Sequence, residues 1–317
     1  MSLPIVEGLL AGERRALARA ISIIDNDDPQ SREIIRQIFN KTGKAKIVGF
    51  TGPGGAGKSS LIGKVIPELQ ALGYKVAVLA VDPTSPITGG AILGDRVRMQ
   101  GSLDNDKVFM RSMGSRGAVG GISKSLRNAI RILDAAGYDL VLVESVGAGQ
   151  LEVEISKVAN LTIVLFTPNT GDNVQAVKAG LTEIGDIYVI NKSDLEGAIS
   201  LYQTILDLIG DTEKKPVILR TSTKTGKGII EMAKTIDKLL KERSINYKDR
   251  ERKMLEDELK DMVLNIVERR ISSMLMQDDN AKKKEYLEYI GKLERKEIDP
   301  YLAAEQLAAA IFSTNNR

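Results

Sequence analysis

The sequence predicts an α/β protein with a mostly parallel sheet, flanked by N-terminal helices and followed by a C-terminal helical arm. Two observations carry this prediction. From residue 45 to residue 243, apolar runs of strand length alternate with stretches of helical periodicity, the pattern of a parallel sheet covered on both faces. Residues 52–59 match the full P-loop pattern G-x-x-x-x-G-K-[ST], between an apolar run and a helical stretch. Together they predict a P-loop NTPase domain over residues 45–243.

Residues 1–44 are predicted to form two helices ahead of this domain. The first is indicated by an apolar stripe at helical spacing, made of Leu9, Leu10, Leu17, Ala20, Ile21 and Ile24. Asp28 and Pro29 provide a cap and a pre-set first-turn residue for a second helix, which should run to about Phe39.

Seven strands are predicted in the central domain. Their apolar runs cover residues 46–50, 75–81, 108–110, 140–143, 161–166, 187–190 and 217–219. A helix over residues 229–240 should close the domain. Spacing along the chain does not determine the order of these strands in the sheet.

Residues 244–317 are predicted to form the helical arm, because strands disappear there and charge rises. Apolar residues near helical spacing run through the first part of the arm: Leu255, Leu259, Val263, Ile266 and Ile271. Asp299 and Pro300 should start another helix. A narrow apolar stripe on a long charged helix either folds back on its own domain or contacts a second chain, and both alternatives stay open.

Composition excludes several kinds of site. The 317 residues contain no cysteine and no histidine, which rules out disulfides, thiolate or imidazole metal sites and the commonest general base. A metal held by side chains must therefore have oxygen ligands, which points to Mg²⁺. The net charge of only +3 and the lack of a long apolar run indicate neither nucleic acid nor a membrane as a partner. Because the N-terminus has no signal-peptide pattern, we expect the protein in the cytoplasm.

The P-loop predicts binding of a nucleoside polyphosphate. Its glycines let successive backbone N–H groups turn toward phosphate oxygens at a helix N-terminus. We expect Lys58 to reach the β- and γ-phosphates and the Ser59 hydroxyl to bind Mg²⁺. The full cradle is expected to comprise Gly52, Pro53, Gly54, Gly55, Ala56, Gly57, Lys58, Ser59 and Ser60. The alternative is a glycine-rich turn that binds nothing.

The run Asn191-Lys192-Ser193-Asp194 follows the predicted strand 187–190 and favours guanine as the base. The Asp194 carboxylate can accept hydrogen bonds from guanine N1–H and the 2-amino group, a donor pair that adenine lacks. By itself the run is also typical of a solvated turn, but after a P-loop it predicts guanine binding by Asn191, Lys192 and Asp194. Ser222, just beyond the last predicted strand, is a candidate to offer a backbone N–H to the guanine oxygen.

Two acidic residues end predicted strands, where ligands bind in parallel sheets. Asp82 could hold Mg²⁺ directly or through water, and Glu144 opens a loop whose Gly147 could turn its N–H toward the γ-phosphate. Asp95 lies in a stretch rich in glycine and hydroxyl groups, residues 84–98, and could reach the Mg²⁺ shell when that loop closes. Either strand-end acid could instead be a helix cap or a surface charge.

Three further side chains are candidates. Gln150 invites comparison with a water-orienting glutamine, although its offset from the motif differs. Arg111 or Arg116 could bring a positive charge to the phosphates, with a solvated arginine as the alternative.

These residues resemble the methylmalonyl-CoA mutase-associated GTPases of the MeaB/ArgK type, which belong with the metallochaperone P-loop GTPases. The likeness rests on five runs: G-P-G-G-A-G-K-S-S, A-V-D-P-T-S, T-G-G-A-I-L-G-D-R-V-R-M, V-E-S-V-G-A-G-Q and N-K-S-D. Residues 6–21 and 298–304 are similar to the family's terminal segments, so the resemblance covers nearly the whole chain.

The resemblance implies a Mg²⁺-dependent GTPase that acts as a chaperone of a cobalamin-dependent acyl-CoA mutase. Hydrolysis of GTP to GDP would be coupled to correct loading of adenosylcobalamin and to protection of the mutase. The C-terminal helices would form a homodimer. By motif match, the family's roles fall on Lys58 and Ser59 for phosphate and Mg²⁺, on Asp82, Asp95 and Glu144 for the carboxylate set that serves Mg²⁺ and catalysis, and on Asn191 and Asp194 for guanine.

Three rival functions were weighed against this one. A nickel-delivery GTPase would need cysteine or histidine, which the chain lacks. A P-loop kinase linked to amino-acid transport, as ArgK-type proteins have been described, would not need Asn191 and Asp194 to select guanine. A binding module that uses GTP only as a structural ligand would show no turnover.

Overall fold

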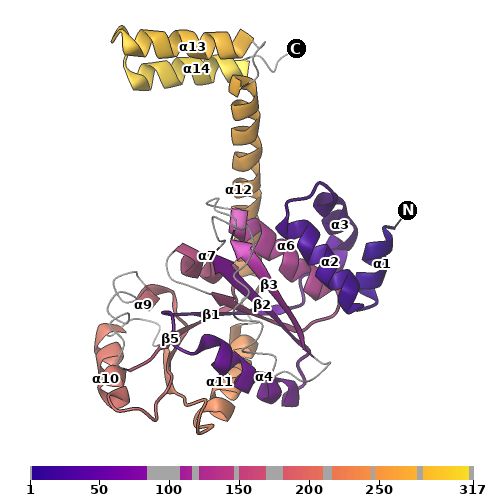
Figure 1. Cartoon of the computed structure of the whole chain (residues 1–317), viewed down its shortest axis with the longest axis vertical. Coiled ribbons are helices and arrows are strands. Elements are labelled where there is room, and N and C mark those ends of the chain that lie inside the picture. The colour runs from indigo at the N-terminus through magenta and orange to yellow at the C-terminus, as the bar shows by residue number, and fades with distance from the viewer. Residues whose placement is uncertain are drawn as a thin grey trace. The chain divides into compact units, whose positions relative to one another are not determined.

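The computed structural model describes residues 2–83, 108–115, 121–145, 150–168, 181–209, 216–243, 247–276 and 281–313 (Figure 1). The chain divides into two compact units, Met1–Tyr247 and Lys248–Arg317. We call them the sheet unit and the C-terminal unit. None of the helices in the described ranges is long and apolar enough to cross a membrane.

The sheet unit is built on strands that all run parallel. Its described residues form seven strands: β1 (Lys46–Thr51), β2 (Val76–Pro83), β3 (Phe109–Ser115), β4 (Leu140–Ser145), β5 (Leu161–Phe166), β6 (Ile187–Ile190) and β7 (Val217–Arg220). The order across the sheet is β3-β2-β4-β1-β5-β6-β7, and every neighbouring pair is parallel. The predicted fold class, a P-loop protein with a mostly parallel sheet and flanking helices, is therefore confirmed.

Helices cover both faces of the sheet, which explains why its strands are apolar on both sides. In the described part of the sheet unit, the helices that follow β1 are α4 (Lys58–Ala71), α6 (Gly121–Ala135), α7 (Gln150–Val158), α9 (Leu181–Ile184), α10 (Ala198–Ile209) and α11 (Ile229–Arg243). On β2, Ala77 and Leu79 join a core with α6 and the N-terminal helices, whereas Val76 and Val78 join a core with α4 and α11. Successive side chains of one strand thus pack into two different cores, one on each face of the sheet.

The N-terminal segment contains three helices rather than the two predicted. They are α1 (Pro4–Leu10), α2 (Arg14–Asp25) and α3 (Gln30–Ile38). The first predicted helix is broken at Gly12, which takes a φ of 76°. The N–H groups of Gly12 and Glu13 donate to the carbonyls of Leu9 and Gly8, both at 3.0 Å, and this bonding ends α1 in a Schellman motif. The break could not be recognised from the apolar stripe, because Leu9 of α1 and Leu17 of α2 are buried in the same core.

The C-terminal unit consists of helices in its described part. They are α12 (Tyr247–Met276), α13 (Ala281–Glu294) and α14 (Pro300–Ser313), with α13 packed against α14 (Figure 1). The cap predicted for α14 is present, since Asp299 Oδ1 accepts the N–H groups of Tyr301 at 2.9 Å and Leu302 at 3.1 Å. The sequence pattern does not predict α13 as a separate helix; Lys and Glu make up half of its residues.

Candidate nucleotide site

The loop of residues 52–57 joins the central strand β1 to α4, and two of its glycines are required by close contacts. Gly57 precedes α4 with a φ of 88°, and a Cβ atom there would lie 2.6 Å from Asn191 Nδ2. Gly52 has a φ of 135°, and a Cβ atom there would collide with the carbonyl oxygen of Leu165. Only glycine fits these positions without displacing β5 or the loop after β6.

Lys58 is the first residue of α4, and its side chain reaches back into this loop. Its side chain is buried, and its Nζ donates to the carbonyl oxygens of Gly52 at 2.6 Å and Pro53 at 3.0 Å. The ammonium group is therefore held beside the glycine-rich backbone, at the N-terminus of α4, where the helix dipole also favours negative charge. Ser60, in the first turn of α4, is exposed. The arrangement suits a polyanion.

Oxygen-bearing side chains gather where β1, β2 and β4 end. Ser59 Oγ donates to Glu144 Oε1 at 2.6 Å, and the Glu144 side chain on β4 is buried. Asp82, on the neighbouring strand β2, is buried as well. Ser145 Oγ donates to Thr51 Oγ1 at 3.3 Å and links β4 to β1. A hydroxyl and two carboxylates are hard oxygen donors, and this donor set fits Mg²⁺.

Asn191 ties the end of β6 to the P-loop. Its side chain is fully buried, and its Nδ2 donates to the Ala56 carbonyl at 2.9 Å while its Oδ1 accepts from Thr221 Oγ1 at 3.1 Å. Lys192 adopts a left-handed φ of 54° and donates from Nζ to the Gly55 carbonyl at 2.9 Å. The loop predicted to read the base is thus bonded directly to the loop predicted to hold phosphate.

Asp194 is oriented by the loop after β7. Ser222 Oγ donates to Asp194 Oδ1 at 2.5 Å, and this hydrogen bond holds the pKa of Asp194 below its usual range. The N–H groups of Thr221 and Ser222 already donate to the carbonyls of Ile190 and Lys227. Ser222 is therefore placed to act through its hydroxyl on Asp194 rather than through its backbone N–H. The position of Ser222 after the last predicted strand identified this loop as a candidate. It could not show whether Ser222 acts through its hydroxyl or through its backbone N–H.

The remaining candidates divide into two groups. Arg111 donates from Nη2 to Ser22 Oγ at 2.6 Å, which directs its guanidinium toward α2. Asp95, Gly147 and Arg116 lie outside the described residues, as does the side chain of Gln150.

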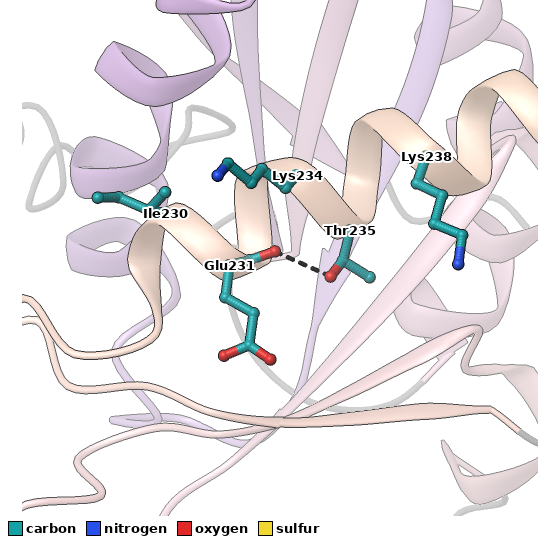
Figure 2. Close-up of a pocket in the computed structure, with 5 residues that line it drawn as sticks. All are labelled: Ile230, Glu231, Lys234, Thr235 and Lys238. Atoms are coloured by element: carbon teal, nitrogen blue, oxygen red, sulfur yellow. Dashed lines mark hydrogen bonds between the residues drawn. The ribbon is translucent and has the colours of Figure 1, made fainter.

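A shallow hollow of about 390 Å³ lies on α11, away from these groups (Figure 2). Its lining consists of Ile230, Glu231, Lys234, Thr235 and Lys238. The bond drawn there, from Thr235 Oγ1 to the Glu231 carbonyl at 2.8 Å, stays within the helix. None of the residues predicted for nucleotide binding lines this hollow.

Comparison with known proteins decides the family. Residues 17–278 match the family model of the methylmalonyl-CoA mutase-associated GTPase MeaB. The chain belongs to the MeaB family. It is 44% identical to a putative GTPase of Pyrococcus abyssi over 97% of this chain and 96% of that protein. It is 36% identical to the GTPase ArgK of Escherichia coli, over 72% of each chain. A crystal structure of a LAO/AO transport system kinase has a TM-score of 0.70 at 25% identity, over 97% of this chain and 96% of that one.

Membership of the MeaB family makes this protein a P-loop GTPase that binds guanine nucleotide. The resemblance drawn from the sequence motifs is thereby confirmed. The chemistry of the described part of the site agrees with that activity, since a lysine side chain held by a glycine-rich loop lies near buried oxygen donors and Asp194 is oriented by Ser222.

Proposed function

We propose that this MeaB-family GTPase uses Mg²⁺ and acts as a chaperone of a cobalamin-dependent acyl-CoA mutase, with methylmalonyl-CoA mutase as the first candidate. GTP hydrolysis would be coupled to loading of adenosylcobalamin and to protection of the mutase. The observation that carries the proposal is the family match over residues 17–278, whose description names that mutase. The nucleotide site described above supports the GTPase part of it.

Phosphate binding follows from the loop geometry. The cradle of residues 52–60 would surround the phosphates, and Lys58 would exchange its bonds to the Gly52 and Pro53 carbonyls for bonds to β- and γ-phosphate oxygens. An ammonium group already positioned in the loop loses little side-chain freedom when the nucleotide binds. Gly147, outside the described residues, stays a predicted donor to the γ-phosphate.

Ser59, Asp82 and Glu144 would hold Mg²⁺, and Asp95 completes the predicted set. Bound Mg²⁺ would neutralise charge on the phosphate oxygens. Phosphoryl transfer depends mainly on positioning and electrostatics, so we assign catalysis to Lys58, Asp95 and Glu144. Of the two candidate arginines, Arg111 is bonded to Ser22 on α2 and Arg116 lies outside the described residues. We therefore expect slow hydrolysis by the chain alone.

Base selection would depend on Asp194, which Ser222 orients. Asn191 and Lys192 would keep the loop that carries Asp194 bonded to the P-loop. Only guanine offers two N–H donors to a single carboxylate in this geometry. Adenine would leave the Asp194 carboxylate badly paired, which costs binding free energy.

The decisive experiment is GTP turnover by the purified protein, with and without the cobalamin-dependent acyl-CoA mutase of the same organism. A several-fold stimulation that saturates with mutase concentration is expected. The Lys58→Met variant, which keeps the stem of the side chain but removes the ammonium, should show neither basal nor stimulated turnover. A GTP turnover rate that does not change when the mutase is added would refute the chaperone function, while the GTPase activity itself would stand.

A kinase is the second candidate, favoured by one observation. The solved structure with a TM-score of 0.70 is named a LAO/AO transport system kinase. Incubation with γ-labelled GTP distinguishes the two functions, because a kinase transfers the label to an acceptor other than water. Release of all label as inorganic phosphate would exclude the kinase.

We also propose that the protein is a homodimer through its C-terminal unit. Six apolar residues in the described part of α12 are exposed, among them Val263 and Leu264. The other four form a series along the helix: Leu255 (43%), Leu259 (64%), Met262 (44%) and Ile266 (60%). Their spacing of four, three and four residues is that of a coiled-coil seam. A second copy of the same helix would cover such a seam.

A further inference from the structure

The end of α2 is bonded to β3 and to α6 by three polar residues. Arg111 Nη2 donates to Ser22 Oγ at 2.6 Å, and the Gly114 N–H makes a long bond of 3.4 Å to Asp25 Oδ2. Lys124 Nζ, near the start of α6, forms an ion pair with Asp27 Oδ1 at 2.8 Å. Ser22, Asp25 and Asp27 are spaced along the last turn and the cap of α2, and we call them the α2 clamp.

The α2 clamp holds β3 at the level of Asp82. Among the described residues, β3 is the edge strand and pairs only with β2. In that pairing Gly114 is the partner of Asp82, and Arg111 is the partner of Leu79. The strand segment beside Asp82 is therefore held by β2 on one side and by the end of α2 on the other. Figure 1 shows α2 lying next to α6 on this part of the sheet.

Asp27 has a backbone conformation that points to a role for its carboxylate. It lies just after α2 with a left-handed φ of 49°, and the N–H groups of Asp27 and Asp28 close the helix by bonding to Ile24 and Ile23. Glycine is the usual residue there because it takes this conformation without strain. The ion pair gives little stability in return, because the side chains of Asp27 and Lys124 are 55% and 35% exposed. Residues other than glycine are uncommon in this conformation, and such positions gather at functional sites.

We propose that the α2 clamp acts as one unit on β3 and on the start of α6, so that loss of any of its bonds, the Asp27–Lys124 pair included, displaces β3 and with it the Asp82 carboxylate. The N-terminal helices would thereby set the Mg²⁺ dependence of nucleotide binding. The proposal rests on the proposed function, in which Asp82 supports Mg²⁺. Ser22, Asp25 and Asp27 are positioning residues, since they act on β3 and α6.

The first test is Asp27→Gly in the full-length protein. This change removes the carboxylate and relieves the left-handed backbone, so the unfolding midpoint should stay the same or rise. A fluorescent GDP analogue is titrated at a series of Mg²⁺ concentrations and without Mg²⁺. We expect the Mg²⁺ concentration for half-maximal tightening of GDP binding to rise several-fold, with no change in the affinity measured without Mg²⁺. An unchanged Mg²⁺ dependence would overturn the proposal.

Two matched variants check the cause. Lys124→Met removes the other half of the ion pair without touching the strained residue, and it should reproduce the shift. Arg36→Met removes an exposed ion pair to Glu33 on α3, in the same group of helices, and should leave the Mg²⁺ dependence unchanged. If Arg36→Met raises the Mg²⁺ requirement to a similar extent, loss of any charge in these helices has this effect. The specific role proposed for the α2 clamp would then be refuted.

Asp82→Asn separates failure of this proposal from failure of the metal assignment. If Asp82→Asn raises the Mg²⁺ requirement while Asp27→Gly and Lys124→Met do not, the α2 clamp is wrong and the role of Asp82 stands. If Asp82→Asn leaves the Mg²⁺ requirement unchanged in a protein that still binds GDP, the proposed role of Asp82 is wrong. The proposed role of the α2 clamp is then refuted too, because it acts through Asp82.

Discussion

Asp194, the residue proposed to select the base, is oriented by the hydroxyl of Ser222 through a hydrogen bond of 2.5 Å. Replacing Asp194 by Asn keeps the shape of the side chain but removes its charge and one acceptor. We expect GDP affinity to fall roughly tenfold or more, because a lost charged contact of this kind costs about 1–3 kcal/mol. Competition between GDP and ADP measures the effect, and an unchanged preference for guanine would refute the assignment of Asp194 to the base.

The pKa of Asp194 gives a prediction about pH. It is lowered chiefly by the Ser222 hydrogen bond, so the carboxylate stays ionised below its usual range. Guanine binding needs the ionised form, and affinity is therefore lost only as pH falls through the lowered pKa. In Ser222→Ala the pKa should return toward its ordinary value, and GDP affinity should begin to fall at a higher pH.

A series of GDP titrations at decreasing pH compares the wild-type protein with Ser222→Ala. Asp194→Asn is the control, because its side chain does not titrate and its residual affinity should lack this pH dependence. If Ser222→Ala and the wild-type protein lose affinity at the same pH, the hydroxyl does not determine the charge of Asp194.

Sequence reasoning at the residue scale worked where a motif fixes backbone geometry. The pattern of residues 52–59 requires a loop before a helix, and the structure has the Lys58 side chain reaching back into that loop. The bond from Ser59 to Glu144 joins residues 85 positions apart, and no spacing rule predicts it. The hydrogen-bond partners of Thr221 and Ser222 could not be predicted from the sequence either, because they depend on which strands and loops lie beside this loop.

At the scale of elements, one carboxylate connects α6 to the segment that enters β1. Asp134, near the end of α6, is buried and accepts the N–H groups of Gly43 at 2.5 Å, Lys44 at 3.2 Å and Ala45 at 3.1 Å. This is the point where the N-terminal helices pass into the central strand. Three successive backbone donors therefore depend on a single side chain.

We expect Asp134→Ala to lower the free energy of unfolding by about 1–3 kcal/mol, because it leaves the buried Ala45 N–H without an acceptor and exposes the Gly43 and Lys44 N–H groups to water. Asp134→Asn should cost less, since its amide oxygen can still accept. Urea denaturation followed by circular dichroism measures both. A loss below about 0.5 kcal/mol in Asp134→Ala, the range of an ordinary surface substitution, would show that water replaces the carboxylate without penalty.

The strands were more predictable than the helices, and the reason is physical. A strand buried on both faces must be apolar along its length, as in β4 and β5, and such runs are visible in the sequence. A helix break inside an apolar stripe is hidden, as at Gly12, because both helices bury the same face in one core. Strand order depends on packing between distant segments, so the position of β1 between β4 and β5 needed the structure.

At the scale of the whole molecule, the described nucleotide-site residues all belong to the sheet unit, while the long apolar seam lies in the C-terminal unit. The predicted boundary at residue 244 stays a prediction, as does the role of the arm. If α12 pairs with a second copy, two nucleotide sites are joined in one particle. Oligomeric state is therefore the property that links the two units to the proposed function.

The Leu259→Lys variant tests this link. A lysine at the most exposed position of the seam should put like charges side by side in a dimer, so we expect monomers at micromolar concentration by light scattering, with GDP affinity unchanged. Asp257→Lys on the same helix is the matched control, because an exposed charged position two residues away points to a different side. A wild-type protein that is already monomeric, or a Leu259→Lys variant that stays dimeric, would exclude the α12 seam as the dimer interface.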